Sequence, residues 1–185
     1  MTPAPKLYLI RHGQPQAGFG EDPDPGLDER GHRQAAELAK RLEPLGRLSL
    51  ITSPLRRARD TAVPFEQMWK CEARVEPAVA EIPSPSQELA ERAAWIRRVL
   101  GGRWSELPQA YQDWKAQLVA FLCGLRTPSL ITTHFVAINA AVGAARSDDR
   151  MVCFEPDHCS CTVLEQRDGS LRVVSLGRER PTRVG

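Results

Sequence analysis

Residues 7 to 13, Leu7-Tyr8-Leu9-Ile10-Arg11-His12-Gly13, join four apolar residues to an arginine, a histidine and a glycine. A short, continuous apolar run is typical of a strand that is buried on both faces, as in a parallel sheet between two layers of helices. The residues that follow, 14–26, are rich in Gly, Pro and Asp and predict a loop. The chain is therefore expected to begin with a buried strand whose carboxyl end presents Arg11 and His12.

The rest of the chain alternates between short apolar runs and segments with helical periodicity. The apolar or alternating runs predict strands at 48–52, 73–75 and 130–133, and a terminal hairpin of strands at 161–166 and 171–176. Apolar residues spaced three and four apart predict helices from about 28 to 43, at 55–69, as two pieces within 88–126, and at 137–145. This alternation predicts an α/β fold, a three-layer α/β/α sandwich with a mostly parallel central sheet.

The length of 185 residues, with 42% hydrophobic and 26% charged, is that of one ordinary globular domain. We therefore expect residues 1–185 to form a single domain, with the segment at about 83–126 as a small helical cap insertion. The aromatic residues of this segment lie at helical spacing, which is more typical of core packing than of a ligand site: Trp95, Trp104, Tyr111 and Trp114. Nothing in the sequence indicates an oligomeric state.

The net charge of +2 is too small to indicate nucleic acid or an anionic membrane as a partner. No apolar run approaches the roughly 18 residues of a membrane span, and the first residues lack the basic-then-apolar order of a secretory signal. Five cysteines without a Cys-x-x-Cys pair indicate reduced thiols and a cytoplasmic location. Cys159 and Cys161 are interpreted as packing residues, and neither a metal nor a cofactor is predicted.

Chemically active side chains follow the predicted strands at their carboxyl ends, where ligands collect in open α/β sheets. The first strand ends in Arg11-His12-Gly13, the second runs into Ser53-Pro54-Leu55-Arg56-Arg57, and the fourth ends at His134. Glu81 lies in the loop after the short third strand. Because two of the four histidines of the chain stand at these strand ends, one site is predicted there.

The predicted site combines two arginines, two histidines and a carboxylate at one edge of the sheet. This set of groups suits phosphoryl transfer. The guanidinium groups of Arg11 and Arg57 would neutralise and orient a phosphoryl dianion, and their charge would keep His12 neutral as a nucleophile. Glu81 would protonate the leaving alkoxide and then accept a proton from water. A protonated His134 would add positive charge near the transferred oxygens, so this chemistry requires no metal ion.

These residues stand in a pattern that resembles a known family. Leu9-Ile10-Arg11-His12-Gly13 is similar to the signature of the histidine phosphatase superfamily, also called the phosphoglycerate mutase-like family. Three further segments resemble the family's motifs in the family's order: residues 27–35 its first-helix pattern, residues 53–62 its second-arginine motif, and Thr133-His134-Phe135 its second histidine. The resemblance extends from residue 6 to the hairpin near residue 176.

The resemblance implies a role for each of these residues. His12 would be the phosphorylated nucleophile and Glu81 the general acid and base, with Glu76 and Glu88 as neighbouring alternatives for the acid. The phosphate-binding groups would be the other members of the motifs: Arg11, Arg57, His134, Gly13 and the backbone amide of Phe135. A glycine at position 13 would let the backbone approach the phosphate without a Cβ in the way.

Two departures from the family's mutases bear on the reaction. Phosphoglycerate mutases carry a polar, Asn-containing stretch after the first motif, where this chain has Gln14-Pro15-Gln16-Ala17-Gly18. They also carry a Glu-Arg-His-Tyr-Gly type segment at the acid, where this chain has Glu81-Ile82-Pro83-Ser84-Pro85. These groups would retain a glycerate intermediate, so their replacement favours hydrolysis of a small phosphorylated metabolite.

Two alternatives remain open at this stage. One is a phosphohistidine protein phosphatase of the SixA type, which the presence of Glu81 and of the helices within 88–126 argues against. The other is a non-catalytic member of the family that binds phosphorylated ligands, which the complete set of competent residues argues against. Among residues outside the predicted site, Arg56, Arg59 and His32 are expected on the surface and His158 in a structural role.

Overall fold

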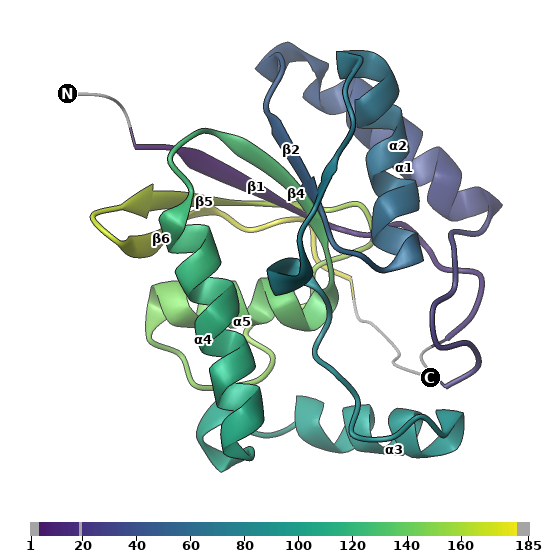
Figure 1. Cartoon of the computed structure of the whole chain (residues 1–185), viewed down its shortest axis with the longest axis vertical. Coiled ribbons are helices and arrows are strands. Elements are labelled where there is room, and N and C mark those ends of the chain that lie inside the picture. The colour runs from purple at the N-terminus through teal and green to yellow at the C-terminus, as the bar shows by residue number, and fades with distance from the viewer. Residues whose placement is uncertain (1–3, 19, 181–185) are drawn as a thin grey trace.

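The computed structural model describes residues 4–18 and 20–180 as one six-stranded mixed sheet between two layers of helices (Figure 1). The strand order is β3-β2-β4-β1-β5-β6. The strands are β1 (Lys6–Arg11), β2 (Ser49–Thr52), β3 (Arg74–Val75), β4 (Ser129–Thr133), β5 (Cys161–Arg167) and β6 (Ser170–Ser175). The first four are mutually parallel, and β5 and β6 are antiparallel to their neighbours, as the predicted terminal hairpin requires.

The described residues form five α-helices, and each was predicted from the sequence to within a few residues. They are α1 (Glu29–Leu42), α2 (Arg56–Trp69), α3 (Leu89–Leu100), α4 (Gln109–Gly124) and α5 (Phe135–Arg146). The start of α1 is stabilised by Asp28, whose Oδ1 accepts a hydrogen bond from the backbone N–H of Gly31 (2.6 Å). None of the helices within residues 4–18 and 20–180 combines the length and apolar character that crossing a membrane requires.

The two faces of the sheet bury separate hydrophobic clusters. Along β1, Leu7 and Leu9 belong to the cluster beneath α4 and α5, whereas Ile10 belongs to the cluster beneath α1 and α2. Alternation of side chains along a strand explains why one continuous apolar run serves both layers. The predicted three-layer α/β/α sandwich is confirmed.

The parallel register places the carboxyl ends of three strands at one edge of the sheet. Arg11 at the end of β1 is paired with Thr133 of β4, and Thr52 at the end of β2 is paired with Thr132. The residues that follow these strands therefore leave the sheet side by side, as a site at strand ends requires.

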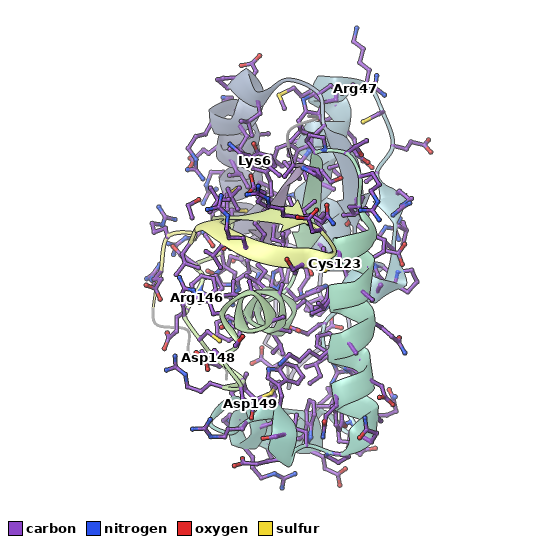
Figure 2. All side chains as sticks on the ribbon, turned by 90° about the vertical axis from the view of Figure 1, so that its left-hand side faces the viewer. Lys6, Arg47, Cys123, Arg146, Asp148 and Asp149 are labelled. Carbon is purple, nitrogen blue, oxygen red and sulfur yellow. The ribbon has the colours of Figure 1, made fainter. Side chains whose placement is uncertain are left out.

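The segment predicted as a helical cap divides between two places. Helix α4 packs against α5 and belongs to the helical layer below the sheet, where Figure 2 shows it running beside α5 seen end-on. Helix α3 lies away from the sheet (Figure 1). Between them, Trp104 and Trp114 stack at 5.8 Å, and Trp95 and Tyr111 lie 5.4 Å apart, which confirms these aromatic side chains as core.

Candidate active site

His12 follows β1 directly, and its side chain is buried with two hydrogen-bonding partners. Nδ1 lies 2.8 Å from the carbonyl oxygen of Gly13, which can only accept, so Nδ1 carries the ring proton. Nε2 lies 3.2 Å from Nε of Arg57, which can only donate, so Nε2 presents its lone pair. These two contacts select the neutral tautomer in which Nε2 keeps its lone pair.

The surroundings of His12 keep its imidazole neutral. Burial lowers the pKa of His12 well below its ordinary value, and the positive charges of Arg57 and Arg11 and the neighbouring His134 lower it further. The imidazole of His12 is therefore neutral near pH 7.

Arg11, the last residue of β1, is held in place from two sides. Its Nη1 donates to the carbonyl oxygen of Pro156 (2.7 Å), and its Cζ lies 5.0 Å from the centre of the Phe135 ring. Burial lowers the pKa of Arg11 to about 10, so the guanidinium keeps its charge at neutral pH. The arrangement fixes a positive charge beside His12.

Arg57 is contributed by the first turn of α2 and is also buried. Thr61 joins this turn to the loop after β1, since its hydroxyl donates to the carbonyl of Arg57 (2.7 Å) and accepts from the N–H of Gly13 (3.0 Å). Nη1 of Arg57 lies 3.8 Å from the Asp24 carboxylate. The neighbouring Arg59 is exposed, as expected from its position on the helix.

Glu81 lies in the loop after β3 and reaches the start of α5. Its Oε2 accepts from the N–H of Val136 (3.2 Å), and its Oε1 accepts from the N–H of Ile82 (3.0 Å). The loop is tied to the sheet by Thr133, whose hydroxyl donates to the carbonyl of Val79 (2.7 Å). These contacts hold the carboxyl group near the ends of the parallel strands.

Burial raises the pKa of Glu81, and this effect outweighs the two amide donors and the charges of Arg57 and Arg11, which lower it. Because a carboxyl group with a raised pKa is more readily protonated near neutral pH, Glu81 suits the role of a proton donor. The alternative acids lie elsewhere: Glu76 accepts from Ala78 N–H (3.1 Å) at the start of a 3-10 turn, and Glu88 is exposed.

His134 stands at the N-terminus of α5 and is fully buried. Its Nε2 lies 2.7 Å from Oγ of Ser53, which also accepts from the N–H of Leu55 (3.2 Å). Its ring centre lies 5.3 Å from that of His12. Within residues 4–18 and 20–180, Nδ1 of His134 has no hydrogen-bond partner.

Burial lowers the pKa of His134 well below its ordinary value, and the charges of Arg57 and Arg11 lower it further. The imidazole is therefore neutral in this structure, so it offers an N–H donor, and the positive charge that a protonated His134 would add is not present. Since the Ser53 hydroxyl can both donate and accept, its contact with Nε2 is compatible with either neutral tautomer of His134.

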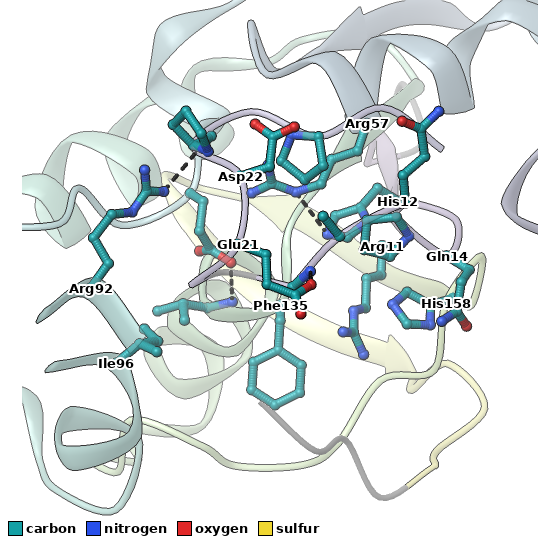
Figure 3. Close-up of a pocket in the computed structure, with 18 of the residues that line it drawn as sticks. Arg11, His12, Gln14, Glu21, Asp22, Arg57, Arg92, Ile96, Phe135 and His158 are labelled. Atoms are coloured by element: carbon teal, nitrogen blue, oxygen red, sulfur yellow. Dashed lines mark hydrogen bonds between the residues drawn. The ribbon is translucent and has the colours of Figure 1, made fainter. Parts of the chain in front are cut away.

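A cavity of about 370 Å³ opens over these residues (Figure 3). Its floor includes His12, Arg11, Arg57 and Glu81, and its walls include residues 14–18, 21–23 and 25 and one face of α3. The labelled residues of α3, Arg92 and Ile96, lie across the cavity from Gln14 and His158 in Figure 3. Of the predicted cap segment, α3 alone faces the cavity.

Gly13 and Phe135 have different surroundings from those expected. A Cβ at Gly13 would lie 2.7 Å from the carbonyl oxygen of Gly31, so the glycine permits close packing of the loop on α1. Gly13 does not line the cavity, whereas Phe135 does, with its ring against Arg11. Phe135 is also the first residue of α5, whose amides point toward the strand ends.

His158 lines the same cavity, although the sequence placed it outside the predicted site in a structural role. Its ring centre lies 5.7 Å from that of His12. The residue lies in an irregular segment between α5 and β5, where neither periodicity nor a strand end marks it. His32, by contrast, is exposed on α1 as expected.

Cysteines do not contribute to this site. Cys159 and Cys161 pack in the cluster beneath α1 and α2, and burial raises the pKa of each thiol to about 12. In the described part of the chain, no group of three or more His, Cys, Asp or Glu side chains is arranged to hold a metal ion.

Comparison with known proteins identifies the family. The model of the histidine phosphatase superfamily (branch 1) matches residues 7–179. A probable phosphoglycerate mutase GpmB of Photorhabdus laumondii is 30% identical over 157 residues, 75% of this chain and 73% of that protein. The protein of the same name from Cronobacter sakazakii is 31% identical over 109 residues, 52% of this chain, and the chain spans about half of its length (50%).

Solved structures share the fold at lower identity. The mycobacterial glucosyl-3-phosphoglycerate phosphatase superposes with a TM-score of 0.76 at 22% identity, covering 96% of this chain and 100% of that chain. The phosphoserine phosphatase of Entamoeba histolytica, solved with 3-phosphoglyceric acid, gives 0.71 at 21% identity, covering 95% and 98%. Since the family model spans nearly the whole chain and the overall fold agrees, this protein belongs to branch 1 of the histidine phosphatase superfamily.

Proposed function

We propose that this protein hydrolyses a small phosphorylated metabolite through a phosphohistidine on Nε2 of His12. The observation that carries the proposal is the pair of hydrogen bonds that leaves Nε2 unprotonated at the floor of a cavity between two guanidinium groups. An unprotonated nitrogen beside fixed positive charge is what attack on a phosphoryl dianion requires.

In the first step, the lone pair of Nε2 attacks phosphorus in line with the ester oxygen. The P–N bond forms as the P–O bond to the leaving group breaks, and the departing oxygen takes the proton of the Glu81 carboxyl group. Arg11 and Arg57 stabilise the negative charge on the phosphoryl oxygens. A ring N–H of His134 and the amide of Phe135 supply further donors.

In the second step, water attacks the phosphohistidine and Glu81, now a carboxylate, accepts its proton. The P–N bond breaks, its electron pair returns to Nε2 of His12, and inorganic phosphate is released. The sum is one phosphomonoester and one water converted into one alcohol and one phosphate, with the enzyme regenerated and no metal ion required.

The walls of the cavity favour hydrolysis of a small molecule. The polar segments expected of a mutase are replaced at residues 14–18 and 81–85, which leaves the site less able to retain an intermediate for rephosphorylation. Residues 14–18, 21–23 and 25 and α3 form walls around the cavity, so a metabolite fits more readily than a histidine on a folded protein. Structural neighbours named as phosphatases support this choice over the mutase name of the sequence relatives.

Hydrolysis of p-nitrophenyl phosphate in the presence of EDTA tests the proposal. We expect turnover that falls by a factor on the order of 10³ or more in His12→Ala. The exposed His32→Ala variant is the matched control and should keep full activity. Rapid acid-free quenching with ³²P-labelled substrate should leave a base-stable, acid-labile label on wild-type protein. Unchanged turnover in His12→Ala would contradict the proposal.

The role of Glu81 is tested with leaving groups of different basicity. Glu81→Gln should slow an alkyl phosphate far more than an aryl phosphate, because a good leaving group needs little protonation. Glu88→Gln, a nearby exposed acid, is the control and should affect neither substrate. If Glu81→Gln slows both substrates equally, another group supplies the proton.

A further inference from the structure

His158 is held at a defined position beside the nucleophile. The N–H of Asp157 donates to the carbonyl of Arg178 (2.8 Å), and the Arg178 guanidinium lies 2.9 Å from Oδ2 of Asp157. On the other side, the N–H of Cys159 donates to the carbonyl of Arg11 (2.9 Å). The backbone of His158 is therefore anchored on both sides, once to the residue that precedes His12.

The side chain of His158 faces the end of the cavity beside His12 and Arg11, where the proposed function places the phosphoryl group. It lies beside Arg11 and Gln14 in Figure 3, on the side away from Arg92 and Ile96 of α3. Its ring centre is 5.7 Å from that of His12. This is a distance at which one phosphoryl group on His12 can also contact the imidazole of His158.

His158 differs from the neighbouring imidazoles of His12 and His134 in its hydrogen bonds. Both nitrogens of His12 and one of His134 have protein partners. Across residues 4–18 and 20–180, His158 bonds only through its backbone N–H, to Oδ1 of Asp157 (2.8 Å). A polar ring in a cavity wall without protein partners retains its donor for a ligand.

The charge state of His158 is consistent with such a role. Burial lowers the pKa of His158 to about 3, and the charge of Arg11 contributes in the same sense. The ring is therefore neutral near pH 7 and carries one N–H, which donates without adding a further cation to a site that already holds two guanidinium groups.

We propose that His158 is a phosphate-binding residue, which donates a ring N–H to an oxygen of the phosphoryl group held by Arg11 and Arg57. The proposal rests on the proposed function, since it places the phosphoryl group on the His12 side of the cavity. It assigns the irregular segment before β5 a direct part in the site.

The test compares His158→Ala, His158→Asn and the control His32→Ala. Inhibition of p-nitrophenyl phosphate hydrolysis by orthovanadate and by inorganic phosphate is measured, together with kcat/KM and the thermal midpoint. Loss of one hydrogen bond to a charged group should weaken both inhibitors about tenfold or more in His158→Ala. His158→Asn keeps an N–H donor and should recover part of this loss, and His32→Ala should behave as wild type.

The outcomes separate this proposal from the proposed function. If His12→Ala is inactive while His158→Ala keeps wild-type inhibition constants, the role of His158 is wrong and hydrolysis stands. If the wild type hydrolyses no phosphomonoester, calorimetric binding of inorganic phosphate replaces inhibition, and weaker binding in His158→Ala still supports the assignment. Equal losses in His158→Ala and His158→Asn with a lowered thermal midpoint would indicate a structural role and overturn it.

Discussion

Nε of Arg57 donates to Nε2 of His12 across 3.2 Å, so one guanidinium contacts His12 and also lines the cavity where a phosphoryl group would bind. The bond selects the tautomer before substrate arrives, and a bound phosphoryl group would compete for the same N–H. In the proposed mechanism, Arg57 therefore first fixes the tautomer of His12 and then binds the phosphoryl group of the substrate.

The tautomer of His12 is directly observable. In ¹⁵N-detected NMR spectra, His12 should appear neutral with its proton on Nδ1, and it should remain so to well below pH 6.5, because burial and Arg57 disfavour the cation. Assignment by comparison with His12→Ala identifies the signal. A His12 imidazole that takes up a proton near pH 6.5, or that carries its proton on Nε2, would contradict the geometry.

Arg57 should tolerate no conservative replacement. Lysine at position 57 keeps the charge but loses the fork of donors that contacts both His12 and a phosphoryl oxygen, so kcat/KM should fall by a factor of roughly 10² to 10³. Arg59→Lys on the same helix is the control, since Arg59 is exposed. Equal activity of the two variants would remove Arg57 from the mechanism.

The Asp24 carboxylate lies 3.8 Å from Nη1 of Arg57. Because its negative charge repels a phosphate bound by Arg57, Asp24 should weaken phosphate binding. Asp24→Asn retains an Oδ1 that can accept from the N–H of Arg56 (2.9 Å) and should leave the start of α2 intact. We expect inhibition by inorganic phosphate to strengthen by about 2- to 5-fold at low salt, and less at high salt. Glu29→Gln, an exposed acid on α1, should show no such change.

Gly31 is required by packing, although it lies inside a helix. A Cβ there would overlap the carbonyl oxygen of Gln14, so Gly31→Ala should lower the free energy of unfolding by about 1–3 kcal/mol in urea denaturation. Gly124→Ala, also helical and with no atom within 4 Å of the added Cβ, should instead be neutral or stabilising by up to about 1 kcal/mol. Equal changes in the free energy of unfolding for the two variants would contradict the close approach of the 13–14 backbone to α1.

Stability should fall between pH 7.5 and pH 5.5. The pKa values of His12, His134 and His158 are lowered in the folded protein, so the unfolded chain binds more protons below pH 6.5 and stability is lost as pH falls. The raised pKa of Glu81 acts in the opposite sense, but one carboxyl opposes three imidazoles. For His158, with a pKa of about 3, the loss amounts to about 1 kcal/mol over this interval.

Urea denaturation at the two pH values measures this loss. His158→Gln cannot take up the proton, so its stability should change less between pH 7.5 and pH 5.5 than that of the wild type. An identical change in both proteins would show that His158 does not contribute.

The amino-acid sequence by itself determined the elements and the order in which they carry functional groups. The apolar run before Arg11 and the runs before Ser53 and His134 specify buried strands, and parallel pairing brings their carboxyl ends to one edge whatever the details of packing. His12, Arg57 and His134 could therefore be placed in one site from local patterns alone.

Only the tertiary structure decided what surrounds that site. His158 is held at the cavity by its neighbours, because the N–H of Asp157 donates to the carbonyl of Arg178 and the N–H of Cys159 donates to the carbonyl of Arg11. Such contacts between residues far apart in the chain leave no local periodicity. The same holds for Gly13, whose missing Cβ accommodates the backbone of Gly31, and for the division of α3 from α4. Short-range spacing determines strands and helices, whereas side-chain packing between them determines which residues share a cavity.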